Sequence, residues 1–293
     1  MKRSLASLLL SCCVAQFLTG QIMYDIKTSI DWTSMEIKAQ TALNLGAARI
    51  KLPGGRVQAE RLIEAEYAQL IRPLIMDIPV DSSRRISDLL RDGELTAAAV
   101  DALSRPSHQT PPALSTDMGS MRVSYTVSLR AIGASLLRHS RPSAVRPPLS
   151  PVKAPAYTGI IIIASGSLPI HGRNASSLVQ PCLFPKIWDT DMNLIYERGM
   201  TDPDTGAEGI VTYVPEEAIF RAVPSGMDSA LEARAGANPL RIIARKVFGI
   251  YPTDPVIDRS DALLILSTEE NRRLLREARV VFALAPSVLN APL

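Results

Sequence analysis

The chain has 293 residues, 46% of them hydrophobic, which is enough to bury a substantial core and to form two domains of ordinary size. Its 32 Lys and Arg residues nearly balance its 29 Asp and Glu residues, so the net charge of +3 gives no basis for nucleic-acid binding. Aromatic residues make up 5% of the chain, too few for a platform that stacks single-stranded bases. The composition therefore excludes a wholly disordered chain and argues against nucleic acid as a partner.

The first twenty residues have the order of a secretory signal peptide. A positively charged start precedes an apolar run from Leu5 to Leu18, and the polar chain begins at Gln21. The run is shorter than the about 20 residues that a membrane-spanning helix needs. We therefore expect residues 1–20 to be cleaved and the mature protein to be periplasmic or associated with the outer membrane. Lipidation at Cys12 is a less favoured alternative, because the apolar run before it is short.

Residues 21–137 are predicted to form an N-terminal, lipoprotein-like α+β domain. Its best helix covers residues 56–74, where apolar side chains recur at every third and fourth position, and Pro73 is expected to end or bend it. Residues 121–129 alternate strictly between apolar and polar, which predicts a strand with one face in the core. The other predicted elements are strands over 22–30 and 33–45, a turn over 51–55, a helix over 86–90 capped at Asp81–Ser83 and closed by Gly93, a helix over 95–103 and a loop over 105–114.

Residues 138–155 contain five prolines and four Lys or Arg residues. This composition predicts a semi-rigid basic linker, and we place the domain boundary within it. The same basic residues offer a surface for peripheral association with anionic lipid or glycan, although a solvated linker is the simpler interpretation.

Residues 156–293 are predicted to form a β-rich α+β domain. Residues 157–164 are strongly apolar and β-branched, which predicts a strand buried on both faces. Two strands over 183–188 and 192–197 flank a polar turn at 189–191, which predicts a hairpin. Further strands are expected over 209–214, 230–234, 240–248 and 279–285, and helices over 262–266 and 268–278. The predicted fold class is therefore α+β, with two small mixed sheets packed with helices and joined by the Pro-rich basic linker.

The sequence contains no strong catalytic motif. Ser165 and Ser167, with His171 and Asp189, have the residue types of an acyl-transfer triad, but the glycine-flanked turn that exposes a nucleophilic serine is absent. The pattern Asp189-x-Asp191-x-Asn193 begins like a calcium loop and then lacks the glycine and the glutamate of such a loop. A hairpin turn is the better interpretation of this pattern.

Histidine and cysteine also give no site. His108, His139 and His171 are too scattered along the sequence to indicate zinc. Once the signal peptide is removed, Cys182 is the last cysteine, so an internal disulfide is ruled out, and its apolar neighbours predict a buried structural thiol. We therefore predict no catalytic residue, no cofactor and no metal.

Several segments together resemble known exported proteins. They are APAYTGIIIIASG, PCLFPKIWDTDMNLIYE, RAGANPLRIIARKVFG, TDPVIDRSDALLIL and LLREARVVFAL. With these, the chain resembles uncharacterised exported envelope proteins of spirochaetes over nearly its whole mature length. The N-terminal segments IDWTSMEIKAQTALNL, IKLPGGRVQAERLIEAEYAQLIRPL and IPVDSSRRISDLL are similar to the small outer-membrane lipoprotein domain of flagellar basal-disk proteins and to flagellar assembly protein T. The resemblance implies scaffolding or assembly in the envelope, with the flagellar motor as one such place, and it carries no catalytic residue.

Export, the lack of catalytic motifs and the resemblance favour a non-enzymatic structural or assembly factor that contacts envelope or flagellar proteins. The candidate contact residues are Trp188 and Tyr196 of the hairpin and His171 of the loop before it, although aromatic side chains also pack in cores. The alternative is a periplasmic ligand-binding module or hydrolase that uses the His171 loop. That alternative needs a pocket joining His171 to Ser165 or Asp189. The sequence leaves the oligomeric state open.

Overall fold

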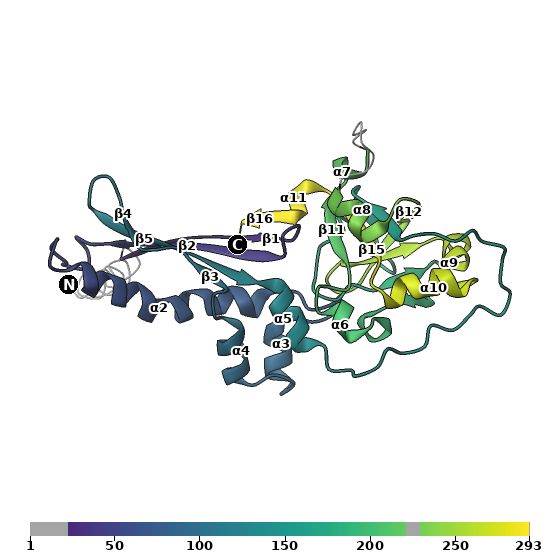
Figure 1. Ribbon diagram of the computed structural model, residues 1–293, viewed down its shortest axis with the longest axis horizontal. Helices are drawn as coiled ribbons and strands as arrows, with labels where there is room; N and C mark the ends of the chain where they lie inside the picture. The colour runs from purple at the N-terminus through teal and green to yellow at the C-terminus, as the bar shows by residue number, and fades with distance from the viewer. Residues whose placement is uncertain (1–22, 221–228, 293) are drawn as a thin grey trace, which may run out of the picture.

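The computed structural model describes residues 23–220 and 229–292, and within these ranges the chain forms two parts that lie next to each other along the long axis (Figure 1). The first part is an antiparallel sheet with helices on one face, and the second combines a parallel sheet with smaller sheets and helices. The fold class is α+β, as predicted. Among the described residues, no helix combines the length and the apolar character that crossing a membrane requires.

The N-terminal sheet has the strand order β16-β1-β2-β5-β3, with β4 also paired to β5. Its strands are β1 (Tyr24–Asp31), β2 (Glu36–Asn44), β3 (His108–Gln109), β4 (Ala113–Leu114), β5 (Ser120–Ser128) and β16 (Asn290–Pro292). The three long strands confirm the predictions over 22–30, 33–45 and 121–129, although β2 begins later than expected. The chain turns before it, where Met35 has a φ of 58°. The predicted loop over 105–114 contains the two short edge strands β3 and β4.

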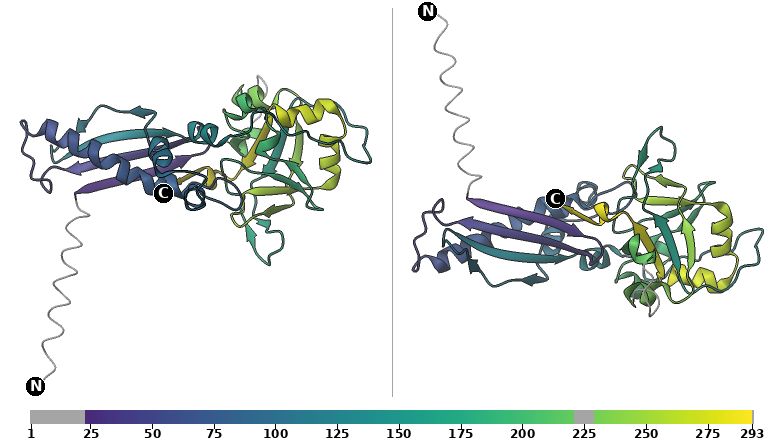
Figure 2. Two further views of the ribbon diagram at one scale, coloured as in Figure 1. Left: turned by 90° about the horizontal axis from the view of Figure 1, so that it is seen from below. Right: turned by 90° about the horizontal axis from the view of Figure 1, so that it is seen from above.

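Four helices belong to this part: α2 (Arg56–Asp77), α3 (Ile86–Arg91), α4 (Ala97–Leu103) and α5 (Leu129–Leu136). Helix α2 runs along one face of the sheet, and seen from above the other face is uncovered (Figure 2). Its buried side chains recur at every fourth position, from Ala59 through Ile63, Tyr67 and Ile71 to Ile75. This row, which is inclined to the helix axis, packs against the apolar side chains that alternate along β2 and β5. Pro73 does not end this helix, which continues for another turn.

The prediction that Asp81 caps helix α3 is wrong. The N-cap of α3 is Arg85, whose backbone N–H donates to the Asp88 carboxylate at 2.8 Å. Asp81 instead organises the turn before it, since its carboxylate accepts from the backbone N–H groups of Ser83 at 2.9 Å and Arg84 at 3.0 Å. The aspartate therefore shapes a loop rather than a helix end.

This loop, residues 79–85, joins the two parts of the molecule. The N–H of Leu183 donates to the Pro79 carbonyl at 3.0 Å, and the N–H of Phe184 donates to the Val80 carbonyl at 2.8 Å. The N–H of Tyr251 donates to the Ser82 carbonyl at 2.9 Å. These backbone bonds bind the loop to the second part at two separate places.

The second part is built around a four-stranded parallel sheet with the order β11-β15-β6-β12. Beside it lie a four-stranded mixed sheet, with the order β10-β9-β14-β13, and a two-stranded hairpin. The strands are β6 (Ile160–Ala164), β7 (Leu168–Pro169), β8 (Ser176–Ser177), β9 (Ile187–Asp189), β10 (Leu194–Tyr196), β11 (Thr212–Pro215), β12 (Leu240–Ile243), β13 (Lys246–Phe248), β14 (Asp254–Ile257) and β15 (Val280–Leu284). The described residues thus form more sheets than the two predicted.

Short helices complete this part: η1 (Arg198–Met200), α6 (Pro203–Gly206), α7 (Glu217–Phe220), α8 (Ser229–Ala235), α9 (Arg259–Leu266), α10 (Glu269–Arg276) and α11 (Pro286–Leu289). Strand β6 is central and buried, and β9 and β10 form the predicted hairpin. The strand expected over 230–234 is wrong: its Ala, Leu, Glu and Arg residues favour the helix α8. The strand expected over 240–248 divides into β12 and β13, which belong to different sheets.

The predicted linker over 138–155 has no helix or strand and lies against the second part. The Ser143 N–H donates to the Gly199 carbonyl at 2.7 Å, and the Val152 N–H donates to the Ser267 hydroxyl at 2.9 Å. His139, just after α5, contacts the Thr201 carbonyl through Nε2 at 2.8 Å. The segment therefore both connects the two parts in sequence and follows the surface of the second.

The end of the chain returns to the first part. Strand β16 pairs antiparallel with β1, with Ala291 opposite Ile30. The Trp32 ring, at the end of β1, meets the edge of the Tyr213 ring of β11 with centroids 5.8 Å apart. Although residues 156–293 are expected to form one domain, the last strand completes the N-terminal sheet. The predicted signal peptide and Cys12 lie outside the described residues.

We predict that Asp81 stabilises the fold in a pH-dependent way. Burial alone would raise the pKa of Asp81, but its bonds from Ser83 and the charge of Arg84 outweigh burial and hold the pKa below its ordinary value. The ionised carboxylate therefore contributes stability above the unfolded-state pKa of about 3.9, and this contribution is lost as the pH falls. Asp81→Asn should lower the free energy of unfolding by about 1–3 kcal/mol at neutral pH.

Urea denaturation at several pH values measures this effect. The loss caused by Asp81→Asn should shrink as the pH falls below about 4, because the wild-type carboxylate is then protonated. Asp101→Asn is the control, since its exposed ion pair with Arg72 should contribute less than about 1 kcal/mol. A loss that is equal at neutral and acidic pH would contradict the role of the ionised carboxylate.

Candidate functional site

The structure does not bring together the residues that have the types of an acyl-transfer triad. The Asp189 carboxylate accepts from the backbone N–H groups of Asp191 at 3.0 Å and Asn193 at 2.8 Å, and from the Asn193 side chain at 2.8 Å. These bonds close the β9–β10 turn, as predicted for a hairpin. The His171 ring forms no hydrogen bond with Asp189 or Ser165, and its buried Nδ1 has no hydrogen-bond partner among the described residues. No nucleophile and base are therefore in contact here.

His171 lies in an aromatic group. Its ring meets the edge of the Phe248 ring with centroids 6.1 Å apart, and Phe248 meets the Trp188 ring in the same way at 5.6 Å. The backbone N–H of His171 donates to the Val247 carbonyl at 2.8 Å. His171 therefore joins the β7–β8 hairpin to the mixed sheet.

The two aromatic residues of the hairpin have structural contacts. Tyr196 is 0% exposed, and its hydroxyl donates to the Ile210 carbonyl at 2.7 Å. Trp188 is partly buried, and its Nε1–H donates to the Asp254 carboxylate at 3.1 Å. Tyr196 is thus unavailable to a partner in this structure, which corrects its assignment as a contact residue. Trp188 keeps some exposed surface, but its indole Nε1–H already donates a hydrogen bond to Asp254.

Asp254 has a buried carboxylate that forms no ion pair within 4 Å with any described residue. Its oxygens accept from the Lys186 backbone N–H at 3.1 Å, from Trp188 and from the Thr253 hydroxyl at 3.0 Å. Burial raises the pKa of this carboxyl, although these donors and the Ser82 hydroxyl act in the opposite direction. Because Ser82 belongs to the loop of the first part, the group links the two parts. Its geometry is that of a structural anchor.

The remaining cysteine and the histidine of β3 have no metal-ligand or nucleophile partners among the described residues. Cys182 is buried, and burial raises the pKa of its thiol, so the reactive thiolate is disfavoured. His108 lies exposed on β3, and the described residues contain no group of three His, Cys, Asp or Glu side chains that could hold a metal ion.

A feature open to a ligand or partner is the side of the N-terminal sheet that no described helix covers, which we call the open face. It comprises Asp25, Lys27, Ser29, Lys38, Gln40, Ala42, Asn44, Ser120, Arg122, Ser124 and Thr126. Each of these residues lines one of two open hollows, of about 240 and about 430 Å³. All but Ala42 are polar, because residues of this parity on β1, β2 and β5 point away from α2.

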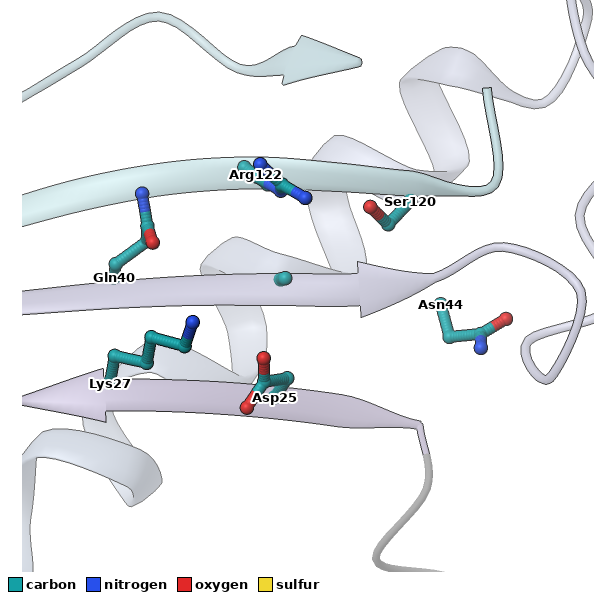
Figure 3. A pocket seen from close by; sticks show the side chains of 7 residues that line it. Asp25, Lys27, Gln40, Asn44, Ser120 and Arg122 are labelled. Atoms are coloured by element: carbon teal, nitrogen blue, oxygen red, sulfur yellow. The ribbon is translucent and has the colours of Figure 1, made fainter. Parts of the chain in front are cut away.

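The charges of the open face are unevenly paired. At one end the Lys38 ammonium lies 3.5 Å from the Asp31 carboxylate and 3.7 Å from that of Glu36. Toward the other end, Lys27 and Arg122 lie on either side of β2, and no described residue forms an ion pair with either of them within 4 Å (Figure 3). The face therefore offers free cations, amides and hydroxyls to a polar surface.

The sequence contained a signal for this face. The strict alternation over 121–129 identified the core side of the strand, and the same alternation places Arg122, Ser124 and Thr126 together on the other side. What the sequence could not show is that no other element within residues 23–220 and 229–292 covers that side. A polar face on a single strand has the same pattern whether water or another protein lies against it.

Two family models match the chain. Residues 24–135 match the model described as Treponema pallidum Tp0624, N-terminal domain, and residues 159–286 match the model described as Treponema pallidum Tp0624, second domain. No curated protein matches the chain. The matches support the resemblance to spirochaete proteins, whereas neither is to a flagellar basal-disk protein or to flagellar assembly protein T. The chain is thus similar, in the same order along the sequence, to the N-terminal and second domains of Treponema pallidum Tp0624.

Proposed function

We propose that the protein is a non-enzymatic component of the cell envelope, a structural or assembly factor that acts through contacts with other proteins. The observation that carries this proposal is the open face: a long, polar, uncovered sheet surface with unpaired cations. A sheet face of this kind can bind a complementary polar protein surface by hydrogen bonds and ion pairs. It has too little apolar area to hold a lipid chain or a drug-sized apolar ligand.

The positions of the candidate catalytic residues support a binding role. Catalysis by a serine requires a base within hydrogen-bond reach, and the His171 ring makes no such bond with Ser165 in this structure. The rings around His171 contact one another rather than line a cavity with convergent polar groups. A hydrolase at the His171 loop therefore has no geometric support.

The proposed location rests on two observations. The first twenty residues have the pattern of a signal peptide, which supports export to the periplasm and association with the outer membrane. The second is the sequence resemblance to exported spirochaete envelope proteins, of which the family models support the similarity to a spirochaete protein. The flagellar motor is one envelope assembly in which such a factor would act. The experiment described next would identify bound proteins and so decide between the motor and other assemblies.

We predict that a variant of the open face loses its partner. Arg122→Glu/Ser124→Glu changes the charge of β5 by three units on the open face, so an interface that uses these side chains should lose at least about tenfold in recovered partner. The measurement is cross-linking and co-purification of the tagged protein from solubilised envelopes, with mass spectrometry of the bound proteins. Basal-body components among them would place the protein at the flagellar motor.

The matched control lies on the opposite side of the sheet. Gln58→Glu/Arg61→Glu introduces the same change in charge at exposed positions of α2 and should leave recovery unchanged. If both variants recover the partner equally, the open face is not the interface. If the wild-type protein brings down no partner, the assembly function itself is contradicted.

We further predict that the hairpin aromatics support folding rather than binding. Tyr196→Phe removes the hydroxyl that pairs with the Ile210 carbonyl, and Trp188→Phe removes the donor to Asp254. Each should lower the free energy of unfolding by about 1–3 kcal/mol, because a buried acceptor loses its partner. Urea denaturation measures the loss, and co-purification should be unchanged. A variant of normal stability that no longer recovers the partner would instead identify the hairpin as the interface.

A further inference from the structure

Strand β1 has an edge that the described chain covers only in part. The strand runs over eight residues, from Tyr24 to Asp31, and pairs with β2 along its whole length. On its other side, β16 pairs only with Ser29, Ile30 and Asp31. The first half of the strand, around Ile26, has no neighbouring strand on that side among the described residues. An exposed strand edge of this kind is a template for pairing with another chain.

The hydrogen-bond pattern shows which backbone groups point outward. The N–H of Asn44 donates to the Met23 carbonyl at 2.9 Å, so the odd-numbered residues of β1 bond to β2. The N–H of Trp32 donates to the Leu289 carbonyl at 2.9 Å on the opposite side, which agrees with even-numbered residues pointing outward. The N–H and C=O of Ile26 therefore both point away from the sheet.

Ile26 and its two neighbours leave apolar surface and two opposite charges available to a second strand. Ile26 is 36% exposed, although β-branched apolar residues of edge strands usually gain from being covered. Asp25 and Lys27 flank it on the open face, and no described residue forms an ion pair with either within 4 Å. Figure 3 shows both on the strand at the margin of the face.

We propose that β1 pairs with β1 of a second copy of this chain, antiparallel and centred on Ile26. Twofold symmetry then places Ile26 opposite its own copy as a hydrogen-bonded pair, which uses the two outward N–H and C=O groups. The same register places Asp25 opposite Lys27 of the second copy, and Lys27 opposite Asp25 of the second copy. These are non-hydrogen-bonded pairs, in which Cα atoms are about 4.5 Å apart and side chains meet most closely.

The charge pattern is the reason to choose a second copy as the occupant. A strand with the order acidic, apolar, basic is complementary to itself only in the antiparallel direction and only in this register. The pairing would join two N-terminal sheets edge to edge and continue the open face from one copy to the other. This pairing rests on the proposed function and makes it more specific, because it names a second copy of the chain as one of the protein partners.

Charge-swap variants of the mature full chain test the pairing, with sedimentation equilibrium as the measurement. The wild-type protein should form a dimer that weakens with added salt. Asp25→Lys places lysine opposite Lys27 twice in each dimer, and Lys27→Asp places aspartate opposite Asp25 twice. Each single variant should raise the dimer dissociation constant at least about tenfold, whereas Asp25→Lys/Lys27→Asp restores opposite charges and should return it to near the wild-type value.

Ile26→Pro provides a test that does not depend on charge. Proline removes the outward N–H of residue 26 but no bond to β2, so the sheet should keep its circular dichroism spectrum and lose the dimer. A monomer at every concentration, or a dimer that is insensitive to all four variants, would overturn the proposal. If the wild-type chain is a monomer while Ile26→Pro lowers recovery of a different protein, the edge binds that protein and the second-copy pairing is wrong.

The test of the β1 pairing and the test of the proposed function can fail independently of each other. Arg122 and Ser124 lie on β5, two strands away from β1, so co-purification by the open face does not require the dimer. A wild-type protein that is monomeric at every concentration but recovers its partner normally overturns only the β1 pairing. Absence of any partner together with a stable dimer contradicts the assembly function and leaves the pairing standing.

Discussion

Helix α2 buries one face of the N-terminal sheet, and most of what distinguishes this part of the molecule follows from that one-sided contact. Its buried residues recur at every fourth position from Ala59 to Ile75, so they form one continuous row, inclined to the helix axis, that covers the apolar side of β2 and β5. Alternation along each strand then forces the other half of the side chains to the opposite side, where no helix of the described chain lies. The open face is thus a direct result of how the core is made, and its polarity is what keeps an uncovered sheet soluble.

The second part fixes where this face can act. Loop 79–85 bonds to the second part through its backbone, and the Ser82 hydroxyl also reaches the buried Asp254. Trp32 and Tyr213 pack edge to face between the two parts, and β16 returns from the second part to the margin of β1. Buried residues of both parts belong to one hydrophobic cluster. The short strand β16 pairs with three of the eight residues of β1, so the same connection that ties the parts together leaves the rest of that edge without a partner strand among the described residues.

Local patterns in the sequence predicted the helices and strands better than they predicted which of these elements pack against one another. The four-residue spacing of α2, the alternation of β5 and the polar turn between β9 and β10 each depend on near neighbours, and each was predicted correctly. The run over 157–164 indicated a buried strand but not that β15, more than a hundred residues later, lies parallel beside it. The strand predicted over 230–234 is wrong because so short a segment of mixed apolar and polar residues does not distinguish a strand from about one and a half turns of helix. The site followed the same rule: aromatic residue type suggested Tyr196, but only the three-dimensional structure shows which side chains remain uncovered.

The use of aromatic residues in the core has a consequence for how the protein can bind. Aromatic side chains usually provide the strongest anchors of a protein interface. Here they are few, and Trp32, Tyr67, Tyr125, Tyr196 and Tyr213 are all buried. Contacts made by the N-terminal sheet must therefore depend on backbone groups at a strand edge and on charged or amide side chains of the open face. Such contacts are individually weak and sensitive to salt, so a stable assembly needs several of them at once. Two sheets joined at β1 would present two open faces side by side, and a partner that spans both would bind more tightly than either face alone permits.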